Sequence, residues 1–137
     1  MQLDLTASPH TSDTEFIRLK LREYNQNHVE CELVQELAAF ARNDAQTITG
    51  GIVGLTWGYW FQIQLLWVDQ SSRGKGVGRQ LLLAAEREAK KRGCRFSLID
   101  TFSFQAIGFY LRKGYEIKMT LDAFPVSQQR YYLTKEI

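Results

Sequence analysis

Residues 73–79 combine glycine with basic side chains between two segments of different character. The preceding residues 61–68 are apolar, β-branched or aromatic, which predicts a mostly buried strand. Residues 78–92 instead show apolar side chains at helical spacing, which predicts a helix that ends at Gly93. The connecting turn consists of Arg73, Gly74, Lys75, Gly76, Val77, Gly78 and Arg79.

The charge of this turn is unusual for the start of a helix. Free N–H groups and the helix dipole make a helix N-terminus positive, so acidic side chains are usually found there. Here the bases Arg73, Lys75 and Arg79 occupy it, and no acid precedes Glu86. Glycines let backbone N–H groups converge on an anion, so the segment predicts a phosphate or pyrophosphate site. The alternative is a basic turn that binds nothing, because glycine-rich turns are common.

Two well-known phosphate motifs fit poorly. A magnesium-dependent phosphate loop needs Ser or Thr after Gly-Lys, whereas Gly76 and Val77 follow here. A dinucleotide fingerprint needs a further glycine where this chain has Leu81, although Asp100 stands near the place of its acidic residue. Neither motif therefore identifies the ligand.

A third pattern fits better and has a second match downstream. Arg73-x-x-Gly76-x-Gly78, placed after a strand that ends Trp67-Val68, resembles the acetyl-CoA pyrophosphate loop of the GNAT N-acetyltransferase superfamily. Ala106-x-x-Phe109-Tyr110-x-x-x-Gly114-Tyr115 resembles the helix and strand that follow this loop in the family. The resemblance covers residues 47 to 120 well, and the first forty residues only in their order of strand and helix.

The resemblance implies roles for particular residues. Tyr110 matches the tyrosine that points at the CoA sulfur, and a phenol can donate a proton to a departing thiolate. Main-chain groups at the end of the strand before the loop would hold the pantetheine and acetyl group. Ser103 stands where the family often has Asn, and Leu111 where it often has Glu. The residues expected to bind acetyl-CoA are Leu66, Trp67, Val68, Arg73, Gly74, Lys75, Gly76, Val77, Gly78, Arg79, Ser103, Ala106 and Tyr110.

The general base is less evident from the sequence. Strand 61–68 contains no carboxylate or His, only Gln62 and Gln64. Asp69 and Asp100 follow strands near the expected thioester, and either could act through water, although turn capping is the commoner role of Asp. An aromatic group near the strand ends is expected to line an acceptor pocket or to pack in a core or dimer: Trp57, Tyr59, Trp60 and Trp67.

Length and composition limit the other possibilities. The 137 residues predict one domain, 1–137, with hydrophobic and charged contents typical of a soluble globular protein. Cys31 and Cys94 are far apart in the sequence, which favours reduced thiols and a cytoplasmic location. No apolar run suits a membrane, and no basic stripe with aromatics suits a nucleic acid. Cys31, Cys94, His10 and His28 are isolated, which argues against a metal site. Acids dominate residues 1–36 and bases dominate from residue 70, which suits a cationic amine and CoA phosphates or merely reflects solvated faces.

The expected fold is mixed α/β: one central, mostly antiparallel sheet of about seven strands with helices on both faces, the acyl-CoA N-acyltransferase fold in the family. Strands are expected at 2–6, 36–42, 47–57, 61–68, 95–99, 115–121 and 130–133. Helices are expected from a cap at Ser12 or Asp13 to about 27, at 78–92 and at 104–112, and residues 29–34 are ambiguous. Segment 36–42 has helical composition, but the turn-like residues 43–46 favour a hairpin strand.

Three functions follow from these features. The first is an enzyme that transfers acetyl from acetyl-CoA directly to a primary amine of a small molecule or peptide, without metal or covalent cysteine. The second is a non-catalytic acyl-CoA-binding regulatory module, and the third is a nucleotide-binding regulatory domain. Tyr131 and Tyr132 on the last strand also make a homodimer plausible.

Overall fold

The computed structural model describes residues 1–31 and 33–137, which form two compact units, 1–33 and 34–137. The first unit contains helix α1 (Thr11–Gln26). Its N-cap is His10, without a side-chain hydrogen bond, so the expected cap at Ser12 or Asp13 is wrong. The ambiguous segment 29–34 includes residue 32, which lies outside the described residues.

The expected first strand at residues 2–6 is also absent from the described residues. An extended segment is a strand only when a neighbouring strand pairs with its N–H and C=O groups, and residues 2–6 have no such partner among the described strands. Alternation of polar and apolar side chains predicted the extended backbone but could not supply the partner.

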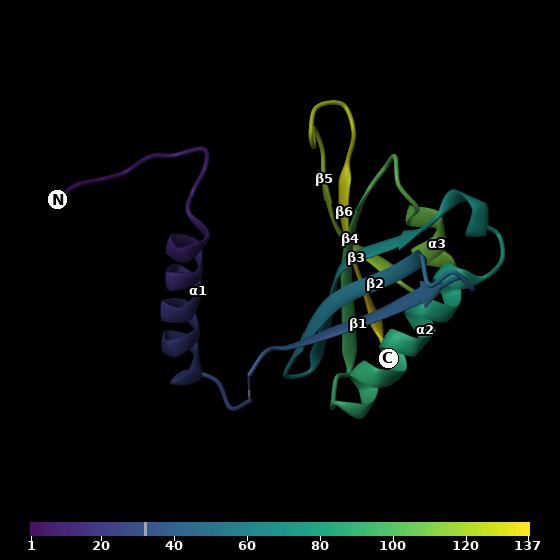
Figure 1. Cartoon of the computed structure of the whole chain (residues 1–137), viewed down its shortest axis with the longest axis horizontal. Coiled ribbons are helices and arrows are strands. Elements are labelled where there is room, and N and C mark those ends of the chain that lie inside the picture. The colour runs from purple at the N-terminus through teal and green to yellow at the C-terminus, as the bar shows by residue number, and fades with distance from the viewer. Residues whose placement is uncertain (32) are drawn as a thin grey trace. The chain divides into compact units, whose positions relative to one another are not determined.

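The second unit is built on a six-stranded sheet, in the order β1-β2-β3-β4-β6-β5 (Figure 1). All neighbours are antiparallel except β3 and β4. The mixed, mostly antiparallel α/β class is confirmed, with six strands in place of about seven. The strands are β1 (Gln35–Arg42), β2 (Ile48–Trp57), β3 (Trp60–Val68), β4 (Phe96–Phe102), β5 (Glu116–Leu121) and β6 (Arg130–Glu136), and the helices are α2 (Val77–Lys91) and α3 (Ile107–Arg112).

The hairpin interpretation of residues 36–42 is confirmed. β1 pairs with β2 in a register that sets Ala38 opposite Val53, and the Asn43 N–H donates to the Thr47 carbonyl across the turn. Leu37 is buried while its neighbours in β1 alternate in exposure, as a strand with one covered face requires. Turn chemistry therefore outweighed the helical composition of this segment.

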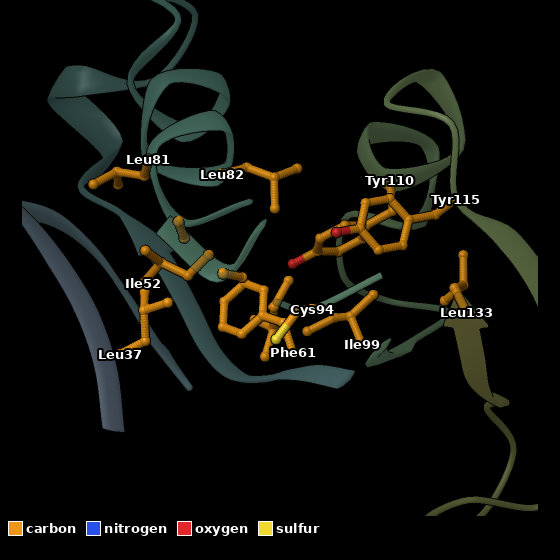
Figure 2. Close-up of a cluster of buried hydrophobic side chains, with 13 residues drawn as sticks. Leu37, Ile52, Phe61, Leu81, Leu82, Cys94, Ile99, Tyr110, Tyr115 and Leu133 are labelled. Carbon is orange, nitrogen blue, oxygen red and sulfur yellow. The ribbon is translucent and has the colours of Figure 1, made fainter. Parts of the chain in front are cut away.

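Helix α2 covers one face of the sheet and supplies much of the core (Figure 2). Its buried positions recur at helical spacing, as predicted, and contact strands β1, β2 and β3. The core continues beneath α3 through Tyr110, and the side chains from the sheet include Ile52, Phe61, Ile63, Ile99 and Leu133. The sequence predicts helices on both faces of the sheet. The remaining helix, α1, belongs to the first unit, which is described separately.

A polar network lies within this otherwise apolar core. Glu86 of α2 is 6% exposed and accepts hydrogen bonds from the Tyr115 hydroxyl at 2.8 Å and from Lys135 Nζ at 3.1 Å. The Tyr115 and Ser97 hydroxyls lie 2.7 Å apart. These contacts join α2 to β4, β6 and the residue that precedes β5. Such a network stabilises the fold only while every buried member keeps its partner.

The ion pair between Lys135 and Glu86 is expected to stabilise the folded protein. Lys135→Met should lower the free energy of unfolding by about 3 kcal/mol, because Glu86 would stay buried without its counter-charge. Urea denaturation at neutral pH measures the change. Lys118→Met removes an exposed lysine paired with Glu116 and serves as control, with a loss below about 1 kcal/mol. Equal stability of the two variants would contradict the expectation.

Candidate functional site

Strands β3 and β4 separate partway along their length. They pair only from Trp60 opposite Phe96 to Ile63 opposite Ile99. Beyond that point β3 remains paired with β2 as far as Val68, and β4 continues along β6 as far as Phe102. The predicted residues Leu66, Trp67 and Val68 therefore lie on a stretch of β3 whose other edge has no partner among the described strands. A ligand can pair with backbone groups along such an edge.

The turn after β3 is fixed by its own polar contacts. Asp69 caps the short 3₁₀ helix Gln70–Ser72 by accepting a hydrogen bond from the Ser71 N–H at 3.2 Å and another from the Ser71 hydroxyl. The Asp69 N–H donates to the Thr49 carbonyl of β2 at 2.7 Å. Arg73 Nε donates to the Val68 carbonyl at 3.1 Å. The loop is therefore held at the end of β3 before α2 begins.

Two glycines give the loop its shape. Gly74 has φ +75° and Gly76 has φ +80°, a left-handed conformation that strains residues with a side chain. A Cβ at either position would have no atom within 4 Å, so both face open space. Gly76 is also the N-cap of α2. The glycines are thus required by conformation, and the space above them is free for a ligand.

The N–H groups of this loop are available for an anion. Within the described part of the chain, the N–H groups from Gly74 to Arg79 donate to no protein acceptor. The first turn of α2 holds no acid, and the side chains of Arg73, Lys75 and Arg79 are exposed around it. N–H groups without a protein acceptor, a helix dipole and three cations together suit a phosphate or pyrophosphate.

Helix α3 meets this loop directly. A Cβ on Gly78 would lie 3.6 Å from both Phe109 Cζ and Val68 Cγ2, so α2, α3 and the end of β3 converge at this glycine. Tyr110 follows Phe109, and its ring meets the Phe109 ring edge-on at 5.2 Å. Ala106 is the N-cap of α3. The two sequence motifs, separated by strand β4, therefore come together in space.

Tyr110 is buried, with 6% of its surface exposed. Among the described residues, the Tyr110 hydroxyl has no hydrogen-bond partner. Every fully buried side-chain oxygen in this part of the chain does have a partner. The Tyr110 hydroxyl is therefore not completely enclosed, and it is free to donate a hydrogen bond to a ligand that reaches it. Burial, and to a lesser extent the negative charge of Asp100, raises the pKa of Tyr110 to about 12. Tyr110 is therefore protonated at neutral pH, as a proton donor must be, although the raised pKa makes it a weaker acid than a free phenol.

Tyr110 and Tyr115 are expected to ionise only at unusually alkaline pH. Burial raises the pKa of Tyr110 to about 12 and also raises that of Tyr115, so both should ionise at a higher pH than a free tyrosine, whose pKa is about 10. A folded-state pKa above the unfolded value of about 10 stabilises the fold fully below pH 10, and this contribution is lost as pH rises towards 12. Absorbance at 295 nm together with unfolding by urea between pH 9 and 12 tests both effects. An absorbance change of the native protein that is complete by about pH 11 would contradict the expectation.

The other predicted polar residues have protein partners. The Ser103 hydroxyl accepts a hydrogen bond from the Gln129 N–H at 3.1 Å. Asp100 accepts from Arg130 at 2.6 and 2.9 Å. The Arg130 guanidinium also lies near the rings of Phe102, Phe124 and Tyr132. Sequence reasoning missed Arg130, because only the pairing of β4 with β6 brings it to Asp100.

Asp69 is a weak candidate for a base at neutral pH. The hydrogen bonds from the Ser71 hydroxyl and N–H hold the pKa of Asp69 below its ordinary value. A carboxylate with a lowered pKa binds a proton less readily. Both candidate carboxylates, Asp69 and Asp100, therefore have a structural partner, which is the alternative that the sequence left open.

The expected cluster of four aromatic residues is wrong. Trp57 pairs with Trp60 at the β2–β3 turn, whereas Trp67 pairs with Gly51 at the other end of β3. Seven residues of extended strand separate the two positions by roughly 23 Å. The Trp60 ring instead stacks on Phe96 at 4.9 Å. Only Trp67 lies at the end of β3 that leads into residues 73–79, which we call the anion loop.

No helix in the described ranges combines the length and apolar character needed to cross a membrane.

The chain matches a known family over much of its length. The model of the acetyltransferase (GNAT) domain matches residues 35–117, which include β1 to β4, the anion loop and α3. The blasticidin-S acetyltransferase of Streptomyces morookaense is 34% identical over 110 residues, covering 80% of this chain and 81% of that protein.

Solved structures agree with this match. A structure from Agrobacterium tumefaciens is 34% identical, with a TM-score of 0.93 over 100% of both chains. An aminoglycoside 6'-N-acetyltransferase complexed with coenzyme A shares the fold, with a TM-score of 0.67, 17% identity and coverage of 93% of this chain and 81% of that chain. The family match and the geometry of the loop lead to one conclusion: this chain is an acetyltransferase of the GNAT family.

Proposed function

We propose that this protein transfers an acetyl group from acetyl-CoA directly to a primary amine of a small molecule. The observation that carries the proposal is the position of Tyr110. This residue lies on a helix that contacts Gly78 of the anion loop, and its hydroxyl has no protein partner among the described residues. The loop, the end of β3 and the helix that carries Tyr110 thus meet at Gly78.

The anion loop would hold the pyrophosphate of the substrate. N–H groups from Gly74 to Arg79 would donate to its oxygens, and Lys75 and Arg79 would balance its charge. The open edge of β3 at Leu66 to Val68 would bind the pantetheine amides as a neighbouring strand would. Bound in this way, the thioester would lie next to the split between β3 and β4.

Tyr110 would serve the second half of the reaction. Attack of the amine on the thioester carbonyl forms a C–N bond, and cleavage of the C–S bond releases a thiolate. Tyr110 would donate its proton to this sulfur, and the ammonium formed on the acceptor would lose one to water or to a base. Asp69 or Asp100 could act through water, although each already has a partner in the fold. Ser103 and Ala106 would shape the site from the side of α3.

A small-molecule amine is the acceptor class that we favour over a peptide. The curated relative from Streptomyces is named for the acetylation of blasticidin S, a small molecule, and this chain aligns with four fifths of it. Trp67, which is 52% exposed at the end of β3, offers an apolar surface beside the thioester. An amine joined to an apolar or planar group would fit this surface.

A second candidate function is supported by a specific observation. Asp69 is held by Ser71 and Asp100 by Arg130, so the candidate site has no unengaged carboxylate at these two positions. A protein that binds acyl-CoA as a regulatory signal would need the loop and the strand edge but no base. Tyr110 would then have no chemical role.

The two functions differ in one measurement. The protein is incubated with acetyl-CoA and a panel of primary amines, and released thiol is measured with a chromogenic disulfide reagent. We expect amine-dependent release together with an acetylated amine detected by mass spectrometry. Samples without amine provide the background. Tight binding of acetyl-CoA without release for any amine class would favour the regulatory module.

A further inference from the structure

Tyr115 touches Tyr110 in two ways. Its N–H donates to the Tyr110 carbonyl at 3.1 Å, at the end of α3. Its ring meets the Tyr110 ring edge-on, with centroids 5.8 Å apart and planes at 73°. Tyr115 is only 2% exposed, and Figure 2 shows the two side chains next to each other in the core. The place of the Tyr115 ring therefore limits where the Tyr110 ring can lie.

The hydroxyl of Tyr115 is held from two sides. It donates to Glu86, because an ionised carboxylate can only accept. A hydroxyl has one hydrogen, so the contact with Ser97 must use the Ser97 proton. Lys135 fixes the carboxylate through contacts of 3.1 and 3.2 Å to its two oxygens. The order of donation is thus Ser97 to Tyr115 to Glu86, with Lys135 on the far side.

This network connects the two parts of the candidate site. Glu86 lies on α2, the helix whose first turn forms the anion loop, and Tyr115 follows α3, which carries Tyr110. A buried ion pair usually adds little stability compared with apolar residues of similar volume. The Phe109 ring already shows that an apolar aromatic packs well against Tyr110. Fold stability alone therefore gives little reason for this whole polar network in place of an apolar one.

We propose that Tyr115 is a positioning residue that orients the Tyr110 phenol, with Glu86, Lys135 and Ser97 fixing its ring. This inference rests on the proposed role of Tyr110 as proton donor. A loosely held Tyr115 would let the Tyr110 ring tilt, and the hydroxyl would move away from the thioester sulfur. Binding of acetyl-CoA would be unaffected, because the anion loop and the edge of β3 do not involve Tyr115.

Tyr115→Phe tests the proposal, because it keeps the ring and removes the hydroxyl. We expect kcat to fall about tenfold, since displacing a catalytic group by a fraction of an ångström has effects of this order. The KM for acetyl-CoA should stay within about twofold of the wild-type value, as expected for a change that leaves substrate binding intact. Tyr24→Phe makes the same chemical change in the first unit, at a side chain that is 65% exposed, and should leave kcat unchanged.

The decisive comparison repeats Tyr115→Phe in a Tyr110→Phe background. If Tyr115 acts through Tyr110, the second substitution should cause no further loss of kcat. A purely structural role would lower kcat by the same factor in both backgrounds and would overturn the proposal, as would an unchanged kcat for Tyr115→Phe alone. Retained turnover in Tyr110→Phe alone would instead refute the proposed role of Tyr110.

Ser97→Ala is a second variant that tests the proposal even when Tyr115→Phe does not fold. Ser97→Ala removes the hydroxyl that donates to Tyr115 and leaves the ion pair of Glu86 with Lys135 in place. Thermal unfolding shows whether each variant is folded at the assay temperature. Should Tyr115→Phe be unfolded, Ser97→Ala decides: a loss of kcat that disappears in the Tyr110→Phe background supports the proposal, and any other result overturns it.

Discussion

Gly76→Ala should weaken the binding of acetyl-CoA by about ten- to a hundredfold, the equivalent of losing one or two charge-assisted hydrogen bonds. Gly76 begins α2, and a Cβ there would point into open space. The free protein therefore has room for the methyl group. The same group would occupy the space in which the pyrophosphate approaches the N–H groups of the loop.

The same chain provides a matched control at the other end of α2. Gly93 has φ +94° and, like Gly76, would have no atom within 4 Å of an added Cβ. Gly76→Ala and Gly93→Ala should each cost about 1 kcal/mol of stability, because both place a side chain in the left-handed region. Only the first should affect binding.

Isothermal titration calorimetry with acetyl-CoA and with analogues that lack the pyrophosphate measures the contribution of this group to binding. Wild type and Gly93→Ala should prefer the pyrophosphate-containing ligand, and Gly76→Ala should lose much of this preference. Equal affinities for acetyl-CoA in all three proteins would show that the loop does not hold the pyrophosphate. The family assignment would stand, but the location of the site would have to change.

The loop could be predicted from sequence because its signals are local. Left-handed backbone requires glycine at Gly74 and Gly76, and the missing acids are visible within one helical turn. The β1–β2 hairpin was predictable for the same reason, since the turn at residues 43–46 determines where the chain reverses. In each case the physical constraint acts between residues that are close along the chain.

The remaining features depend on pairing between distant segments. Arg130 reaches Asp100, and Lys135 reaches Glu86, only because β6 inserts between β4 and β5. Glu86 looks like a surface residue on the helix pattern, with Lys90 one turn later, yet it is buried. The strand predicted at residues 2–6 failed for a related reason, because its alternation contains no information about a partner. The separation of Trp57 from Trp67 likewise follows from strand register rather than from composition.

Tyr110→Phe should lower kcat by about a hundredfold or more, the range expected on removing a general acid. Phenylalanine keeps the ring that meets Phe109 and Tyr115, and the substitution breaks no hydrogen bond within the described part of the protein. Stability and the dissociation constant of acetyl-CoA should therefore stay close to wild type. Steady-state kinetics with an identified amine, combined with calorimetry, measures the two quantities separately.

The pH dependence adds a check that does not rely on a single rate. Because the pKa of Tyr110 is raised to about 12, the phenol stays protonated throughout the usual assay range. The wild-type kcat should therefore show no alkaline decline below about pH 10, where an unperturbed tyrosine would already be half ionised. Tyr110→Phe should lower kcat by a similar factor at every pH in this range. A decline of the wild-type kcat near pH 8, or turnover in Tyr110→Phe equal to wild type, would assign the proton to another group, whereas a parallel loss of acetyl-CoA affinity would make Tyr110 part of the binding surface.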